Sequence, residues 1–254
     1  MTLLLGPGTS ITHDAMSLIG DSGMCLVWIS EHSFKTYAYG EPLISSDKLV
    51  LKKAKAIVTP RKHLEIARKM YQMRFPNDDF KGLSIAKMRS KEGTRMKQIY
   101  QKYADQYNIK WFGRKYDPQN YYASDPINQA ITSANQMLYG ICSAVILALG
   151  LSPALGFIHV GTNKALVYDI SDLYKATISI PIAFKTVKEA GTDFYKVLRE
   201  NMYDKIQAKD LLATIIHDIF VLLNIKQPDL IVTLSLWDNI QYLQKAGIQY
   251  QERR

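Results

Sequence analysis

The chain has 254 residues, of which 47% are apolar and 22% are charged. These values are typical of a soluble globular protein with one large domain, or one domain and a smaller one, and they exclude general disorder. The 32 Lys and Arg residues outnumber the 23 Asp and Glu residues, and the resulting net charge of +9 favours a polyanionic partner.

The first 44 residues carry β-like segments, namely an apolar run at 25–29 and a second extended run at 34–39, with glycines at turns. The apolar start of the chain has no positive residue before Lys35, so it does not read as a secretory signal peptide. We therefore expect a partial N-terminal β domain and linker over residues 1–44, in a cytoplasmic protein.

Positive charge is concentrated between residues 47 and 116, where 19 Lys and Arg residues accompany only six Asp and Glu residues. Start and stop signals predict three helices there, at 47–58, from the Thr59-Pro60 cap to about residue 75, and at 84–107. Solvated lysine faces would explain this composition too, but acidic partners at i,i+4 spacing are few. The segment therefore favours nucleic-acid binding, with Arg89, Lys97 and Arg114 as predicted DNA contacts.

Aromatic residues are dense at the end of this basic segment, interleaved with Lys and Arg. They are Tyr100, Tyr103, Tyr107, Trp111, Phe112, Tyr116, Tyr121 and Tyr122. Such rings stack on exposed bases, each stack being worth about 1–3 kcal/mol. Packing in the core is favoured for the first three tyrosines, which recur at helical spacing. Tyr116, in a turn-like segment, is the better candidate for a DNA contact.

A long segment at 126–163 contains no Asp, Glu, Lys or Arg. Its fully apolar part, 137–151, is shorter than the roughly 20 residues that span a membrane, so we predict a buried core helix that begins at Asp125-Pro126 and ends at Gly150. The two cysteines, Cys25 and Cys142, lie in apolar runs and exclude a disulfide framework or a Cys-rich zinc site.

The predicted fold class is α+β, with a small, truncated N-terminal β-strand domain followed by a mainly α-helical catalytic domain at 45–224 and a C-terminal tail at 225–254. Beyond the core helix, a small hairpin is predicted at 156–169, and helices at about 171–190, 193–207 and 209–224.

A histidine and two acids follow one another around the predicted hairpin. His159 is flanked by Gly156 and Gly161, Asp169 ends an apolar run, and Asp172 begins a predicted helix. One imidazole and one or two carboxylates can ligate a hard cation. A satisfied core histidine and an N-capping aspartate explain the same residues, and spacing alone favours that interpretation.

Glu92 is the only carboxylate between Lys81 and Lys102. A surface pair with Arg89 or Arg95 is one explanation. The functional alternative is a metal ligand within a phosphate-binding face, an arrangement that metal-assisted phosphodiester chemistry requires.

At these residues the chain resembles the CRISPR adaptation integrase family, the catalytic Cas proteins that insert new spacers, and specifically its type I-E branch. The resemblance rests on a set of segments in family order. They are Gly6-Pro7-Gly8-Thr9, Leu26-Val27-Trp28, Tyr37-Ala38-Tyr39-Gly40, Ser46-Asp47-Lys48-Leu49, Glu92-Gly93-Thr94-Arg95, Arg114-Lys115-Tyr116-Asp117-Pro118, Ile127-Asn128-Gln129, Gly156-Phe157-Ile158-His159 and Val167-Tyr168-Asp169-Ile170-Ser171-Asp172.

The resemblance implies that Glu92, His159 and Asp172 bind Mg²⁺ or Mn²⁺, with Asp169 as the supporting acid. It implies that the 3′-hydroxyl of a double-stranded DNA prespacer attacks a phosphodiester at the CRISPR repeat, without ATP. Lys175 would face phosphate, while Tyr116 and Tyr139 match aromatic positions that brace the prespacer ends.

Members of the family act as homodimers within a larger heteromeric complex, flanking a dimer of a small ferredoxin-fold Cas partner. The resemblance implies that the first half of the family's β domain is missing here, and that the apolar run at 230–237 corresponds to the partner-contacting tail. A binding-only nucleic-acid module, with a structural or inactive acidic site, remains the alternative function.

Overall fold

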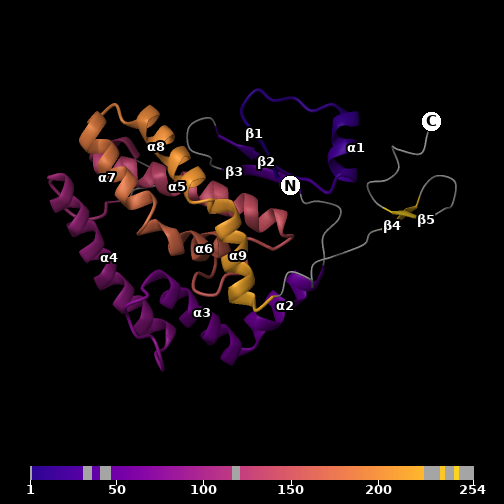
Figure 1. Cartoon of the computed structure of the whole chain (residues 1–254), viewed down its shortest axis with the longest axis horizontal. Coiled ribbons are helices and arrows are strands. Elements are labelled where there is room, and N and C mark those ends of the chain that lie inside the picture. Colours follow the sequence, from indigo (N-terminus) through magenta and orange to yellow (C-terminus); the bar gives the residue numbers. More distant parts are fainter. Residues whose placement is uncertain are drawn as a thin grey trace.

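The computed structural model describes residues 2–30, 36–40, 47–115 and 121–225, together with two short strands at 235–237 and 243–245. A small N-terminal sheet lies beside a larger group of helices (Figure 1). This arrangement confirms the α+β class, with an N-terminal sheet followed by a helical domain.

The N-terminal sheet has the strand order β1-β2-β3, with β1 (Thr2–Leu5) parallel and β3 (Thr36–Gly40) antiparallel to the central β2 (Cys25–Ile29). The bounds of β2 are those predicted. The strand β1 and the helix α1 (His13–Asp21) were not predicted from the sequence. Only Leu5 of β1 is buried, so the strand shows no alternation of buried and exposed residues that a sequence pattern could reveal. The strand is defined by its pairing with β2, a distant segment in which Trp28 is the partner of Leu5.

The basic segment forms three helices within one or two residues of the predicted bounds. They are α2 (Asp47–Val58), α3 (Pro60–Arg74) and α4 (Ile85–Tyr107). The Ser84 hydroxyl caps α4 by accepting from the Lys87 N–H at 3.4 Å, and Asn108 ends it in a left-handed conformation with φ of 51°.

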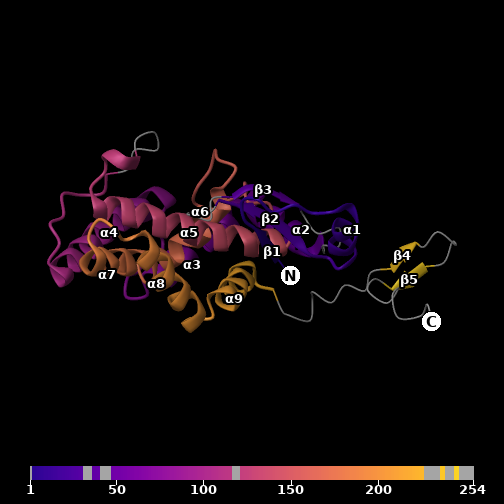
Figure 2. The same cartoon turned by 90° about the horizontal axis from the view of Figure 1, so that it is seen from above.

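Helix α5 (Pro126–Ala148) runs through the molecule from the helical part toward the sheet (Figure 2). The Asp125 carboxylate caps it through the Asn128 N–H at 2.8 Å. In the described part of the chain, α5 is the one helix long and apolar enough to cross a membrane, yet 83% of its apolar window is buried inside the protein. The prediction of a core helix is confirmed.

Two predictions in the second half are wrong. Residues 156–164 form turns rather than a hairpin, and α6 (Ala165–Lys175) begins where the second strand was expected. The predicted helix at 171–190 is two helices, α6 and α7 (Ser179–Ala190). A short buried apolar run does not distinguish a strand from a helix. Proline is tolerated in the first helical turn, which is where α7 places Pro181.

Helices α8 (Tyr195–Ala208) and α9 (Leu211–Leu223) follow, close to their predicted bounds. In the tail, β4 (Ser235–Trp237) pairs antiparallel with β5 (Leu243–Lys245). The extended run predicted at 230–237 is confirmed where it is described, and its strand partner comes from the tail itself.

Candidate functional site

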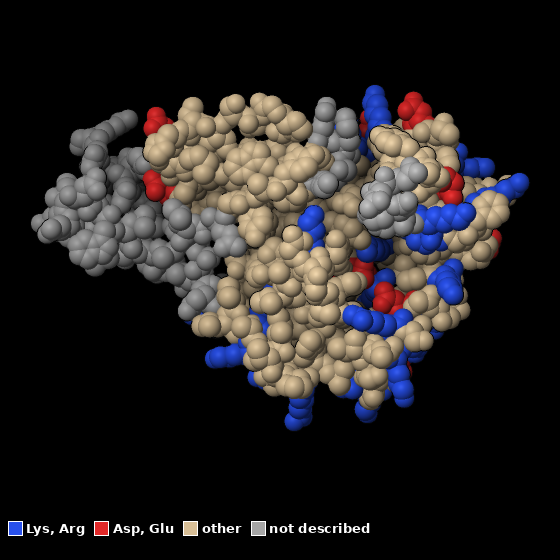
Figure 3. All heavy atoms as spheres, turned by 180° about the vertical axis from the view of Figure 1, so that it is seen from behind, with Lys and Arg blue, Asp and Glu red and all other residues tan. Residues whose placement is uncertain are grey.

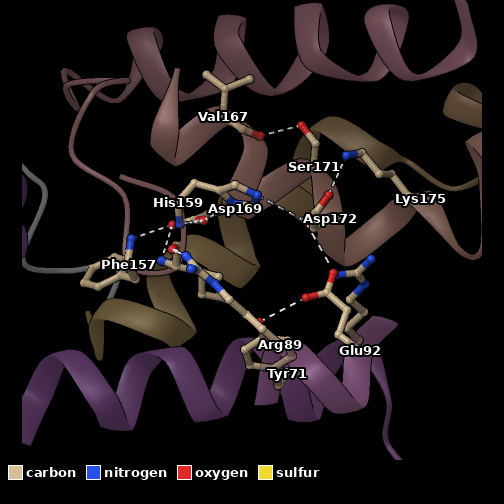
Figure 4. A network of polar contacts seen from close by, with 12 residues as sticks. Tyr71, Arg89, Glu92, Phe157, His159, Val167, Asp169, Ser171, Asp172 and Lys175 are labelled. Atoms are coloured by element: carbon tan, nitrogen blue, oxygen red, sulfur yellow. Dashed lines mark hydrogen bonds and ion pairs between the residues drawn. The ribbon is translucent and has the colours of Figure 1, made fainter. Parts of the chain in front are cut away.

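Three side chains predicted as metal ligands come together from distant parts of the sequence. Glu92 lies on α4, Asp172 in the middle of α6, and His159 in the loop before α6, and Figure 4 shows them pointing toward a common centre. His159 Nε2 lies 4.0 Å from Asp172 Oδ2. Helix α3 also lines the site and contributes Tyr71 and Arg74.

Asp169 holds the histidine loop in place. Its carboxylate is 1% exposed and accepts hydrogen bonds from the backbone N–H groups of Ile158 at 3.0 Å and His159 at 2.9 Å, and from that of Phe157. The same carboxylate lies 2.7 Å from His159 Nδ1. This contact places the proton on Nδ1 of the neutral ring and leaves Nε2 facing Asp172. It also raises the pKa of His159, although burial opposes the shift.

Asp169 is therefore not a helix cap, and Asp172 does not begin a helix. Both lie inside α6, three residues apart, so their carboxylates leave the same side of the helix. Asp169 fixes the loop, and Asp172 is left to face the other two predicted ligands.

The histidine loop is also braced by residues that the sequence analysis missed. The buried Lys53 on α2 donates to the Ser152 carbonyl at 2.6 Å. A Cβ added at Gly156 would lie 2.5 Å from the His159 carbonyl oxygen and 2.7 Å from Asp169 Oδ2. Only glycine fits at that position. The Gly-Phe-Ile-His segment was visible in the sequence, but no local signal pointed to Lys53.

Lys175 occupies the far side of Asp172. Its Nζ lies 2.6 Å from Asp172 Oδ1 and 4.7 Å from the centre of the Tyr139 ring. Burial would raise the pKa of Asp172, but the positive charges of Lys175 and Arg74 outweigh it and lower the pKa. The Lys175 pKa is raised in turn, because the Asp172 charge outweighs the effect of burial. Asp172 is thus held in its ionised form.

Arg74 is a residue of the site that was not predicted from the sequence. Its Nη1 contacts Glu92 Oε1 and lies 3.5 Å from Asp172 Oδ2, so one guanidinium nitrogen joins both carboxylates. Tyr71 donates its hydroxyl to Glu92 Oε2 at 3.0 Å. In this arrangement no group of three or more His, Cys, Asp or Glu side chains in the described ranges is spaced to hold a metal ion. The predicted ligands converge, with an arginine between two of them.

The surface-pair explanation of Glu92 is wrong, because Arg95 pairs with Asp78 and Arg89 donates to the Ile158 carbonyl. The prediction of packing tyrosines is confirmed. Tyr100 stacks on Trp111 with ring centres 5.0 Å apart, and Tyr103 stacks on Phe184.

The other predicted DNA contacts differ in their environments. Lys97 and Arg89 are exposed on α4. Arg114 is half-buried and donates to Asn128 Oδ1 at 2.9 Å and to Thr132 Oγ1 at 2.7 Å. Tyr116 lies outside the described residues. Figure 3 shows Lys and Arg side chains crowded around the part of the surface where α3 and α4 lie, with a few acidic atoms deep among them.

The sequence and the fold are similar to those of a known protein family. The family model described as CRISPR associated protein Cas1 matches residues 79–213, which include Glu92, His159 and Asp172. A CRISPR-associated endonuclease Cas1 from Clostridium sp. (strain SY8519) is 44% identical over 252 residues, covering 98% of this chain and 84% of the relative. The CRISPR-associated endonuclease Cas1 of Escherichia coli (strain K12) is 35% identical over 214 residues, covering 84% of this chain and 70% of the relative.

Solved structures agree with the sequence matches. A crystal structure of a TtCas1–DNA complex has a TM-score of 0.77 at 38% identity and covers 87% of this chain and 83% of its own. A casposase bound to integration product has a TM-score of 0.59 at 14% identity, covering 86% of this chain and 77% of its own, which indicates a shared fold alone. The chain belongs to the Cas1 family of CRISPR-associated proteins.

Proposed function

We propose that this chain is a metal-dependent DNA endonuclease and integrase of the type I-E branch, which acts in the cytoplasm and inserts prespacer DNA into a CRISPR array by transesterification. The observation that carries the proposal is the convergence of Glu92, His159 and Asp172 within a strongly basic surface. Family membership and the likeness to a TtCas1–DNA complex support DNA as the substrate.

The donor set fits a divalent cation of the Mg²⁺ or Mn²⁺ type. Two carboxylates supply hard oxygen ligands, and His159 offers Nε2 because Asp169 occupies Nδ1. When bound, such an ion polarises the scissile phosphate and promotes attack by a 3′-hydroxyl. The protein holds the reactants in line, and no covalent protein nucleophile is needed.

The remaining site residues supply charge and position. Lys175 pairs with Asp172 and lies over the Tyr139 ring, so its positive charge adds to the potential at the proposed ligands, and we expect it to face a phosphate of the DNA. Lys97 and Arg89 extend the positive surface along α4, while Arg114 acts mainly by shaping the start of α5. The proposal also includes a homodimer in complex with a small ferredoxin-fold Cas partner, and aromatic bracing of the duplex ends by Tyr116 and Tyr139.

The decisive test is strand transfer with the partner, Mg²⁺ and a labelled prespacer. Glu92→Ala, His159→Ala and Asp172→Ala should each abolish product while largely sparing prespacer binding, because these residues serve the chemical step and the lysines serve affinity. Manganese should replace magnesium, and a chelator should stop the reaction. Robust Mg²⁺-dependent product from Asp172→Ala would contradict the assignment of Asp172 as a metal ligand.

The same assay separates the rival function. A binding-only module would retain salt-dependent DNA binding and form no product with wild-type protein under any divalent metal. Its acidic cluster would then be two mostly buried ion pairs, formed by Arg74 with Glu92 and with Asp172, and would have a structural role alone.

A further inference from the structure

Arg74 carries a positive charge at the place where the proposed metal ion would also have to lie. Its side chain is 5% exposed, and the same nitrogen, Nη1, contacts both Glu92 Oε1 and Asp172 Oδ2. A divalent cation bound by those two oxygens would meet this nitrogen within contact distance. Like charges in a partly buried site repel strongly, so the arginine and the ion exclude one another.

The contacts of Arg74 show what holds it. A guanidinium with a structural role commonly pairs with a carboxylate through two parallel hydrogen bonds. Here Nη1 contacts both carboxylates and Nη2 lies 3.1 Å from the weak acceptor Met96 Sδ, while the buried Nε has no hydrogen-bond partner among the residues that the structure describes. The guanidinium carbon also lies 5.1 Å from the centre of the Phe75 ring. Charge attraction and this ring contact, rather than a complete set of hydrogen bonds, therefore keep the guanidinium between the acids.

This pattern predicts that Arg74 leaves easily once another cation neutralises the acids. Few good hydrogen bonds are broken when it moves, and an unpaired Nε gains the chance of a partner. Without a competing cation, the same arginine offsets the repulsion between two carboxylates that are mostly buried.

We propose that Arg74 is a built-in counter-ion of the metal site. It holds Glu92 and Asp172 together while no metal is bound, and divalent metal binds only by displacing it. This inference rests on the proposed function, since it concerns the same ligands, and it adds a competing residue that lowers metal affinity.

The test compares Mn²⁺ binding by the full chain and two variants, using calorimetry and the loss of the free-ion electron paramagnetic resonance signal. Arg74→Gln should bind Mn²⁺ about tenfold more tightly or better, because a competing charge a few ångströms away is gone. The matched control, Arg95→Gln, breaks the Arg95–Asp78 pair outside the site and should bind Mn²⁺ as the wild type does. With a chelator present, Arg74→Gln should have a lower melting temperature than the wild type. Addition of Mn²⁺ should raise the melting temperature of Arg74→Gln by more than it raises that of the wild type.

Each outcome of the binding test has a defined meaning. Tighter binding by Arg74→Gln supports the inference, as does binding by the variant alone. Equal or weaker binding by Arg74→Gln, with clear binding by wild type, overturns the inference and leaves the proposed function standing. Absence of binding in both overturns both.

A second measurement needs only the wild-type protein and so does not depend on the variant folding. With ¹⁵N-labelled arginine, the Arg74 Nε–H resonance, assigned by its loss in Arg74→Lys, should move as Mg²⁺ saturates the protein, while that of Arg95 should stay. An Arg74 resonance that is unchanged at a Mg²⁺ concentration shown by calorimetry to fill the site would contradict displacement.

Discussion

Gly156 lies at the tightest point of the histidine loop, beside the Asp169 carboxylate and the His159 carbonyl. Gly156→Ala should lower the free energy of unfolding by about 1–3 kcal/mol, as overpacking does, because the new methyl group must push the loop away from Asp169. Urea unfolding followed by circular dichroism measures the change.

The matched control is Gly93→Ala on α4, where an added Cβ meets nothing within 4 Å. That variant should be unchanged or more stable by up to about 1 kcal/mol, since alanine is the better helix former. A Gly156→Ala protein as stable as wild type would contradict the crowding described at the loop.

Lys53 is a buried lysine whose pKa is lowered from 10.5 to about 8, because burial outweighs the favourable charge of Asp169. Below pH 8 both folded and unfolded chains hold this proton. Between about pH 8 and 10.5 the folded chain releases it and the unfolded chain keeps it, so this group makes stability rise with pH, by up to about 3 kcal/mol.

The measurement is the free energy of unfolding of wild type and Lys53→Met between about pH 7.5 and 10, a range that brackets the lowered pKa of Lys53, about 8. The rise should be present in wild type and smaller in Lys53→Met. Lys55→Met, which changes an exposed lysine of the same helix, should keep the wild-type slope. A Lys53→Met protein with the full slope would show that another group is responsible.

At the scale of elements, α4 carries Glu92 and a row of exposed cations together. Lys87 and Lys97 are exposed on it, whereas replacing Arg114 would also break its hydrogen bonds to Asn128 and Thr132. Lys87→Gln with Lys97→Gln is therefore the cleaner test of the DNA-binding surface.

We expect this double variant to bind prespacer DNA more weakly and to flatten the plot of log affinity against log salt by about two units, one for each phosphate that a lysine no longer neutralises. The control is Lys188→Gln with Lys209→Gln, two exposed lysines at the ends of α7 and α8. An equal slope for both double variants would place the DNA on another surface.

At the scale of the whole molecule, the tail follows α9, which ends at Leu223 with Asn224 as its left-handed cap. The described part of the tail pairs β4 with β5 rather than with the N-terminal sheet. Deleting residues 227–254 should therefore leave the proposed metal site and DNA binding by the isolated chain nearly intact, while weakening assembly with the proposed ferredoxin-fold partner through loss of an added strand or of apolar packing.

Size-exclusion chromatography with the partner tests this expectation, and thermal unfolding of the shortened chain is its control. Partner binding at full strength, or unfolding of the shortened chain, would show that the tail has a structural role instead.

Local sequence was enough to place most of the helices in the described part of the chain. Caps and breakers such as Ser84, Asp125 and Pro60 act over three or four residues, so they locate α3, α4 and α5 without knowledge of the rest of the chain. The charge-free stretch likewise predicted a buried α5. The proposed ligands Glu92, His159 and Asp172 were predicted by resemblance to a family, while spacing alone favoured a structural explanation for the histidine and the aspartate.

Tertiary structure decided what depends on contacts between distant residues. The strand β1 exists because β2 lies beside it, and α6 is a helix because its apolar run is buried among helices. Arg74 contacts Glu92, which is 18 positions away in the sequence, and Asp172, which is 98 positions away. No local sequence pattern encodes such contacts. The family resemblance therefore indicated the proposed ligands, whereas only the packing of α3 against α4 and α6 revealed the cation between two of them.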